Sequence, residues 1–259
     1  MKVIAIGDNC IDNYIYQGEK YVGGCSVNFS VYAKQLGGKT AYLGAVGQDD
    51  NGSLIVDALK ERGVDVSHVH IMDGKTAVTE VALIDGERNF LSYEEGVLKN
   101  LNLTEEDEKY IRTFELLHTS VYGNIDQKLE SLSKDIQICY DFGNKLNYPD
   151  KKRILEYISY AFFSYTEDDE YIRSLLKEAI SHGVKCAIAT LGENGSMAYD
   201  GEQWYHQGAR KVEIVDTIGA GDSFIAGFSI AVLSGKSIQE CLSAGALKAE
   251  ETIQHFGAI

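Results

Sequence analysis

The sequence has little proline, few cysteines and no long hydrophobic run, and each shortage excludes a class of protein. There is one proline in 259 residues and no Ser/Gly-rich or single-charge tract, so nothing indicates a flexible linker. The five cysteines form no C-x-x-C pair, which excludes a zinc knuckle and favours reduced thiols over a disulfide framework. Because no apolar run approaches the roughly 18 residues of a membrane span and no signal-peptide region opens the chain, we expect a cytoplasmic protein with no membrane partner.

Positive charge is also scarce. The chain has 24 Lys and Arg against 39 Asp and Glu, a net charge of −15, which would repel a nucleic-acid backbone and excludes nucleic acid as the expected partner. An anionic ligand would have to be held locally, by backbone N–H groups, a helix N-terminus or a metal ion. The 44% hydrophobic content supports a large core, and we expect residues 1–259 to form a single domain.

Strand and helix patterns alternate along the chain. The apolar run at 3–6, which ends at Gly7, predicts a buried strand, and helix-spaced apolar residues between Phe29 and Leu36 predict a helix that stops at Gly37. Further strands are predicted at 114–118, 136–141, 160–164 and 184–190. This order predicts an α/β fold with a doubly wound, mostly parallel sheet flanked by helices.

One region has the two-residue period of an antiparallel hairpin. Apolar and polar residues alternate from Ala77 to Ile84 and lead through Asp85-Gly86 into the segment 88–93. We expect a small β lid formed from roughly 10–22 and 76–95. Exposed lid strands would leave an uncovered sheet edge, through which we expect two copies of the chain to pair as a homodimer.

The strongest local motif is the segment Asp216-Thr217-Ile218-Gly219-Ala220-Gly221-Asp222, which opens an apolar helix. Glycines in the first turn let a ligand approach the outward-pointing N–H groups, so the motif predicts an anion hole. A carboxylate there would oppose a bound phosphate unless it accepts a proton from an incoming hydroxyl, which makes Asp222 a candidate base. The alternative is that Asp222 is only a favourable first-turn acid.

Together with other motifs, this segment resembles the ribokinase-like (PfkB) carbohydrate kinase family. The D-T-x-G-A-G-D signature matches at every fixed position. The other matching elements are Gly7 and Asp12, Gly23 and Gly24 followed by Asn28, Val46-Gly47 with Asp49 and Gly52, the hairpin at 85–88, and Thr190-Leu191-Gly192 with Gly195. They span nearly the whole chain in the family's order. The resemblance implies an ATP-dependent sugar kinase with the ribokinase-like fold.

The resemblance also implies roles for individual residues. Asp222 would be the catalytic base, with Gly219, Ala220 and Gly221 supplying N–H groups to the transferring phosphoryl group. The implied substrate-binding residues are Asp8, Asp12, Gly23, Gly24, Asn28 and Arg88. The implied ATP-binding residues are Thr190, Gly192, Gly195, Thr217, Gly219, Gly221 and Gly257.

The resemblance also implies two metal ions. Glu167 would bind Mg²⁺, and Asp216 would bind a monovalent cation such as K⁺.

The sequence departs from the family's pattern in two motifs. Ser164 stands where relatives commonly have the asparagine of N-x-x-E. In the D-x-N-x-R element that begins at Asp141, glycine replaces the asparagine and Lys145 the arginine, so a bidentate phosphate contact is lost.

Within the family the chain is most similar to kinases of fructosamines, on segments such as TLGENGS at 190–196 and DTIGAGDSFIAGF at 216–228. The implied reaction is phosphorylation of the 6-hydroxyl of fructoselysine, an Amadori compound, whose ammonium groups would meet Glu94 and Glu95. A solvated acidic turn is the alternative for those two residues. The alternatives for the whole chain are a kinase of another fructosamine, a ketose or a nucleoside, and a non-catalytic sugar or nucleotide sensor.

Two other readings receive no support from the sequence. A Rossmann dehydrogenase is excluded because no G-x-G-x-x-G follows the first strand. His68 and His70 lie on one face of a possible strand without a nearby carboxylate pattern, so we expect them to pack or face solvent rather than bind a metal.

Overall fold

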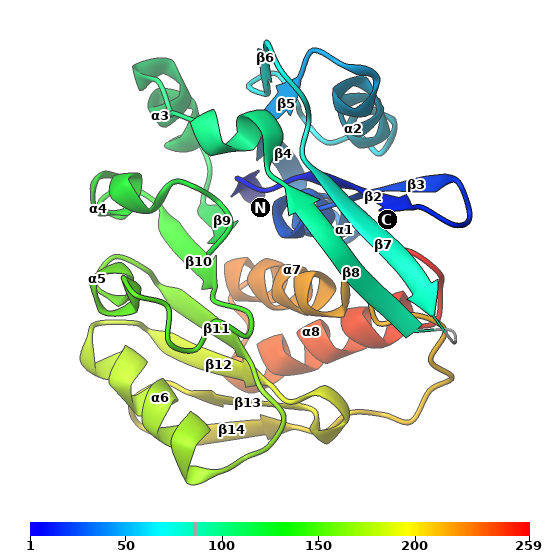
Figure 1. Cartoon of the computed structure of the whole chain (residues 1–259). Coiled ribbons are helices and arrows are strands. Elements are labelled where there is room, and N and C mark those ends of the chain that lie inside the picture. The colour runs from blue at the N-terminus through cyan, green and yellow to red at the C-terminus, as the bar shows by residue number, and fades with distance from the viewer. Residues whose placement is uncertain (85–86) are drawn as a thin grey trace.

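The computed structural model describes the backbone of residues 1–84 and 87–259, and the side chains of these residues other than 83, 84 and 87–90. A main sheet of eight strands runs through the molecule in the order β14-β13-β12-β11-β10-β9-β1-β4 (Figure 1). Its strands are β1 (Lys2–Ile6), β4 (Lys39–Leu43), β9 (Leu116–Ser120), β10 (Gln137–Asp141), β11 (Tyr160–Ser164), β12 (Cys186–Thr190), β13 (Ser196–Tyr199) and β14 (Trp204–Gln207). The pairs from β4 to β12 are parallel and the last two are antiparallel, which confirms the predicted mostly parallel α/β sheet.

Helices cover both faces of this sheet. One hydrophobic cluster packs the sheet against α1 (Cys25–Gln35), α2 (Asp50–Glu61), α7 (Ala220–Leu233) and α8 (Ile238–Thr252). The other cluster lies under η1 (Gly96–Asn100), α3 (Glu105–Ile111), α4 (Leu129–Leu132), α5 (Lys151–Leu155) and α6 (Glu170–Ser181). Among the described helices, none has the length and apolarity needed to cross a bilayer.

Strand β1 explains why its sequence is a continuous apolar run. Val3 and Ala5 belong to the cluster with α1 and α7, whereas Ile4 and Ile6 belong to the opposite cluster. Since successive side chains of a strand point to opposite faces, a strand covered on both sides needs apolar residues at every position.

A second, smaller sheet contains β3 (Glu19–Gly23), β2 (Cys10–Tyr14), β7 (Val78–Ile84) and β8 (Glu87–Glu94), in that order. We call it the small sheet. It draws its strands from the two segments expected to form a lid, and β2 pairs with β7 in parallel. The predicted turn at Asp85-Gly86 lies outside the described residues. A separate pair joins β5 (Ala45–Gly47) to β6 (His70–Met72).

The winding of the main sheet reverses at β1, which has β4 on one side and β9 on the other. The parallel strands all end at one edge, and a ligand crevice is expected where connections leave that edge in opposite directions. Asp8 follows β1, while Ser120 and Asp141 are the last residues of β9 and β10. The topology therefore places polar side chains at the expected crevice.

Candidate active site

Asp8 fixes the start of α1 against the strand ends. One carboxylate oxygen accepts the backbone N–H of Cys25 at 2.6 Å, and the other accepts the hydroxyls of Ser26 at 3.1 Å and Ser120 at 3.2 Å. The side chain is buried. The structure thus gives Asp8 a clear positioning contact, and its predicted contact with substrate stays a prediction.

The next turn of α1 brings Asn28 to Asp222. The Asn28 amide donates to Asp222 Oδ2 at 2.8 Å, and both side chains are more than nine-tenths buried. Asp222 lies in the first turn of α7, so the N-terminal parts of α1 and α7 meet at this contact. Asn28 Oδ1 has no hydrogen-bond partner among the described residues. A buried amide oxygen left in this way can accept a hydrogen bond from a ligand hydroxyl.

Burial sets the protonation of the acids in this crevice. It raises the pKa of Asp222 to about 7, and the charges of Asp141 and Asp8 add to the rise, whereas the Asn28 hydrogen bond opposes it. The pKa of Asp141 rises to about 6, mainly through burial, with a bond from the Gly143 N–H working against the increase. Asp222 is therefore poised to exchange a proton near neutral pH.

The glycine loop before α7 has the geometry of an open anion hole. Gly219 has φ 74°, and a Cβ there would lie 2.6 Å from the Tyr32 hydroxyl, so the position requires glycine. A Cβ on Gly221 would meet no atom within 4 Å, which leaves open space over the first turn. The N–H groups of a first turn lack intrahelical acceptors. The Ala220 N–H donates to the Thr217 carbonyl at 3.3 Å, so a ligand in this space would have to share that donor.

The two ends of the loop differ in exposure. Asp216 is buried and accepts the backbone N–H groups of Ile218 at 3.0 Å and Gly257 at 2.8 Å, which joins the loop to the C-terminal segment. Thr217 is exposed beside the glycines. Phe256 continues this contact by packing on Tyr14 and Tyr21 of the small sheet at ring distances of 6.4 and 5.6 Å.

The residues predicted to bind the acceptor lie where the small sheet joins α1. Cys10 donates to Asp12 Oδ1 at 3.4 Å, and a Cβ on Gly23 would lie 2.8 Å from Asp12 Oδ2. Gly24, with φ 108°, leads into α1, and a Cβ there would lie 2.6 Å from Asn9 Cα. Both glycines therefore allow backbone and carboxylate to approach closely. The side chain of Arg88 lies outside the described residues.

The predicted nucleotide residues occupy the turn between β12 and β13. Thr190 ends β12, and Gly192 and Gly195 have φ 57° and 87° in the turn that follows. A cavity of about 400 Å³ adjoins this turn. Its lining residues are Glu167, Asp168, Leu191, Asn194, Ser196, His206, Gln207 and Gly208. Glu167 is exposed at this cavity, a position compatible with a divalent ion on a nucleotide phosphate.

The structure adds residues that the sequence analysis did not assign to the site. Cys25, Asp141 and Asp222 each offer a ligand atom, and these atoms lie within 4.8 Å of one another. A thiol is a poor ligand for Mg²⁺, so the group as a whole does not favour that ion. Tyr122 borders the same acids, since burial and then the charges of Cys25, Asp141 and Asp8 raise its pKa. The family element beginning at Asp141 was the available sequence signal for this carboxylate.

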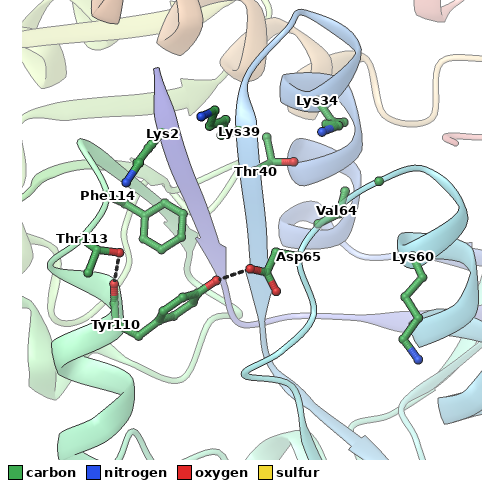
Figure 2. A pocket seen from close by; sticks show the side chains of 11 residues that line it. Lys2, Lys34, Lys39, Thr40, Lys60, Val64, Asp65, Tyr110, Thr113 and Phe114 are labelled. Atoms are coloured by element: carbon green, nitrogen blue, oxygen red, sulfur yellow. Dashed lines mark hydrogen bonds between the residues drawn. The ribbon is translucent and has the colours of Figure 1, made fainter.

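A different cavity, of about 530 Å³, lies at the opposite edge of the main sheet, where β1 and β4 begin (Figure 2). Four of the side chains around it are lysines: Lys2, Lys34, Lys39 and Lys60. It is separate from the crevice because the crevice lies at the carboxyl ends of the same strands.

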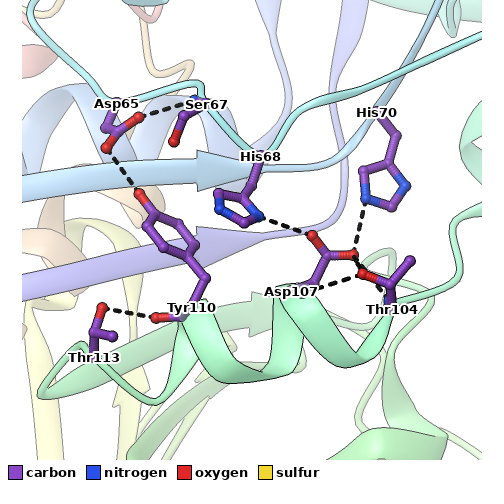
Figure 3. Close-up of polar contacts among 8 residues, drawn as sticks. All are labelled: Asp65, Ser67, His68, His70, Thr104, Asp107, Tyr110 and Thr113. Carbon is purple, nitrogen blue, oxygen red and sulfur yellow. Dashed lines mark hydrogen bonds and ion pairs between the residues drawn. The ribbon is translucent and has the colours of Figure 1, made fainter.

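His68 and His70 both contact a carboxylate that the local sequence pattern did not indicate. His68 Nδ1 and His70 Nε2 each lie 3.0 Å from a different oxygen of Asp107 (Figure 3). Asp107 also forms a capping box with Thr104 at the start of α3. Local sequence reasoning missed the contact since Asp107 lies 37 and 39 positions from the histidines.

Comparisons with known proteins identify the family of the chain. The chain is 37% identical over 260 residues to "Fructoselysine 6-kinase" of Escherichia coli K12, covering 100% of both chains. It is 34% identical to "Fructosamine kinase FrlD" of Bacillus subtilis, covering 100% of this chain and 93% of the relative. The Arabidopsis thaliana ribokinase solved with ribose and ATP superposes with a TM-score of 0.91 at 24% identity, covering 99% and 93% of the two chains. The model of the pfkB family of carbohydrate kinases matches residues 3–259, and the chain belongs to that family.

Proposed function

We propose that the protein transfers the γ-phosphoryl group of ATP to the 6-hydroxyl of fructoselysine. The observation that carries this proposal is the hydrogen bond from Asn28 to Asp222 at the N-terminus of α7. It joins an amide that can bind a sugar hydroxyl to a carboxylate whose pKa of about 7 suits proton transfer. The relatives named as kinases of fructoselysine and fructosamines support the choice of acceptor.

In the proposed step, the acceptor oxygen attacks the γ-phosphorus of ATP and its proton passes to Asp222. The bond from that phosphorus to the β,γ-bridging oxygen breaks, and ADP leaves with that oxygen. Backbone N–H groups of Gly219, Ala220 and Gly221 would stabilise the charge on the phosphoryl oxygens. The open space over Gly221 supports this role, because a ligand can reach the backbone there.

The acceptor would lie between α1 and the small sheet. Asp12 and Asn28 supply a carboxylate and an amide, which suit neighbouring hydroxyls of a sugar. Gly23 and Gly24 leave room beside the backbone. The arm of fructoselysine carries ammonium groups, and Glu94 at the end of β8 is an exposed acid that can meet one of them. Glu95 already accepts the Asn124 amide at 2.6 Å and would have to share that contact.

ATP would lie toward the turn of Thr190, Gly192 and Gly195, with Thr217 and Gly257 on the side of the glycine loop. The cavity beside this turn supports the placement. Mg²⁺, when bound to the phosphates, neutralises charge that develops during transfer. Glu167 fits such an ion because its exposed carboxylate faces this cavity and offers the hard oxygen that Mg²⁺ prefers.

Two further parts of the proposal concern a cation and a partner. A monovalent cation would bind beside Asp216, in the loop that this buried carboxylate joins to Gly257. A second copy of the chain would pair through the small sheet, where Tyr16 and Leu91 are exposed apolar side chains. Sedimentation of the purified protein, and turnover in KCl against tetramethylammonium chloride, test the two ideas separately.

The function is tested by ADP release from Mg-ATP with purified protein. The acceptors are fructoselysine, a second fructosamine, fructose, ribose and a nucleoside. Preferential turnover of fructoselysine, with phosphate located on the 6-hydroxyl by NMR, supports the proposal. Preferential turnover of another acceptor would identify that compound, and not fructoselysine, as the substrate. ATP binding without turnover of any acceptor would favour a sensor.

A matched pair of variants separates catalysis from folding in this assay. Asp222→Asn removes the proposed base, whereas Asp126→Asn alters another carboxyl whose pKa burial raises, bonded to Tyr140 and Tyr148 away from the crevice. Loss of turnover in the first variant alone supports the role of Asp222. Equal turnover of both variants would rule out Asp222 as the base.

A further inference from the structure

The cavity of Figure 2 gathers lysines from four elements at the edge of the main sheet opposite the crevice. Lys2 and Lys39 are the first residues of β1 and β4, and they are paired in register. Lys34 and Lys60 lie in the last turns of α1 and α2. The cavity volume of about 530 Å³ is within the range of sites for small molecules.

The positive charge of these lysines is largely uncompensated by protein carboxylates. Among the described residues, Lys2, Lys34 and Lys39 have no ion pair, and Lys60 pairs with Asp57 at 3.8 Å through exposed side chains. Such an exposed pair contributes little. This concentration of free ammonium groups is unusual for a chain with a net charge of −15.

The one carboxylate that lines this described cavity is already engaged. Asp65 accepts the Tyr110 hydroxyl at 2.8 Å and the Ser67 backbone N–H at 2.9 Å. Both of its oxygens therefore already accept a hydrogen bond, as Figure 3 shows. Its negative charge lowers the local potential only in part, since four lysines share the lining.

Two aromatic side chains beside Asp65 offer an apolar surface to an anion with an organic part. Tyr110 and Phe114 meet edge to face at 5.0 Å, and both line the cavity.

Helix dipoles alone do not explain this arrangement. Lysines at helix C-termini are favoured by the local negative potential, which accounts for Lys34 and Lys60 separately. It does not account for Lys2 and Lys39, which begin strands. All four lysines nevertheless line one cavity, around which their ammonium groups are spread (Figure 2).

We propose that this basic cavity binds a phosphate-bearing small molecule, with its phosphate on the lysines and its organic part against Tyr110 and Phe114. Lysine ammonium groups bind phosphate as point charges, and an aromatic wall suits an apolar or aromatic group. The site is distinct from the crevice, so the proposal does not depend on which sugar the protein phosphorylates.

The test is lysine labelling with an amine-reactive reagent, read by peptide mass spectrometry with and without ligand. The probes are AMP, inorganic pyrophosphate and adenosine, and the lysines outside the cavity are internal references. At a probe concentration of about ten times Kd, labelling of the four cavity lysines should fall about tenfold, because only free protein reacts. AMP or pyrophosphate protection at these lysines, weakened by salt, supports the proposal.

Two pairs of lysine variants show whether the protection from labelling arises from binding at this cavity. Lys34→Gln with Lys60→Gln should abolish protection at Lys2 and Lys39. The control pair, Lys152→Gln with Lys236→Gln, removes two exposed lysines with similarly loose ion pairs of 3.7 and 3.5 Å and should leave protection intact. Unchanged labelling with both AMP and pyrophosphate, equal protection by uncharged adenosine, or full protection in the Lys34/Lys60 variant would overturn the proposal.

Discussion

Asn28 and Asp222 are 194 positions apart in the chain, yet the amide of the first donates to the carboxylate of the second at 2.8 Å. The contact ties the N-terminal half of α1 to the first turn of α7. It also links the two sides of the proposed reaction, in which Asn28 is the proposed acceptor-side residue and Asp222 the proposed base. Replacing Asn28 should therefore change the pKa of Asp222 as well as the binding of the acceptor.

The pH dependence of turnover should reflect Asp222. With a pKa of about 7 raised by burial, the carboxyl is largely protonated at pH 6 and ionised at pH 8. Since a base must be ionised to accept a proton, kcat/KM should rise with pH through this range and then level off. Initial rates across pH 5.5–9 measure this limb, and a rate independent of pH there would contradict the assignment.

Asn28→Ala should move that limb to higher pH. The Asn28 hydrogen bond lowers the pKa of Asp222, so its removal leaves burial and the neighbouring acids less opposed. KM for the acceptor should also rise, by about tenfold for one lost hydrogen bond to a sugar hydroxyl. Ser30→Ala, a control on the same helix, removes a hydroxyl bonded only to the Val27 carbonyl among the described residues and should not shift the limb.

Asp222→Asn should reduce kcat by at least about 10²-fold. It should also make the stability of the fold less dependent on pH. A folded pKa raised above the unfolded value means that the stability supplied by the protonated carboxyl is lost as pH rises from about 4 to about 7. The variant lacks that loss. Urea unfolding at pH 5 and pH 8 should show a smaller decline for the variant than for the parent, and an equal decline would refute the linkage.

His118 should make the protein acid-sensitive. Burial lowers the pKa of this histidine to about 3, its ring stacks on Phe29 at 4.2 Å, and neither ring nitrogen has a hydrogen-bond partner among the described residues. The unfolded chain binds a proton near pH 6.5 that the folded chain does not bind, so stability should fall as pH drops toward 3, by up to about 1.4 kcal/mol per pH unit.

The matching variant is His118→Leu, which removes two unpartnered polar atoms at nearly constant volume. It should raise the free energy of unfolding at pH 5 by about 1–2 kcal/mol. His255→Leu changes an exposed histidine and should have little effect. Destabilisation by His118→Leu at pH 5 would show that the ring has a hydrogen-bonding role.

Asp107→Ala should destabilise the fold more than the loss of one helix cap. Asp107 bonds His68, His70 and Thr104, and its pKa is lowered because the hydrogen bonds outweigh burial. We expect a loss of about 2–4 kcal/mol at pH 7. Glu240→Ala removes the same capping-box position in α8 without histidine partners and should cost less. Similar losses in both variants would mean that the histidines contribute nothing.

The sequence predicts elements well where a single local pattern decides them. The apolar run at 3–6 became β1 because both faces of that strand are covered. The glycines at 219 and 221 lie at the start of α7 as expected, although only Gly219 has a positive φ and a close neighbour that require glycine. Local patterns could not place Asp107 between two histidines or Asn28 against Asp222, because tertiary packing makes those contacts. The pKa values of Asp222 and Asp141 likewise depend on burial that no local motif encodes.

The small sheet is assembled from two separate stretches of chain, 10–23 and 78–94, and each leaves the main body and returns to it. Pairing of β2 with β7 is what makes them one unit. No single cut at either end of the chain could remove this unit, and a deletion of one stretch would leave the other without its central neighbour. Compared with a relative that lacks the small sheet, this chain would therefore carry two coordinated insertions. A protease that cuts one hairpin would leave both fragments anchored in the main sheet.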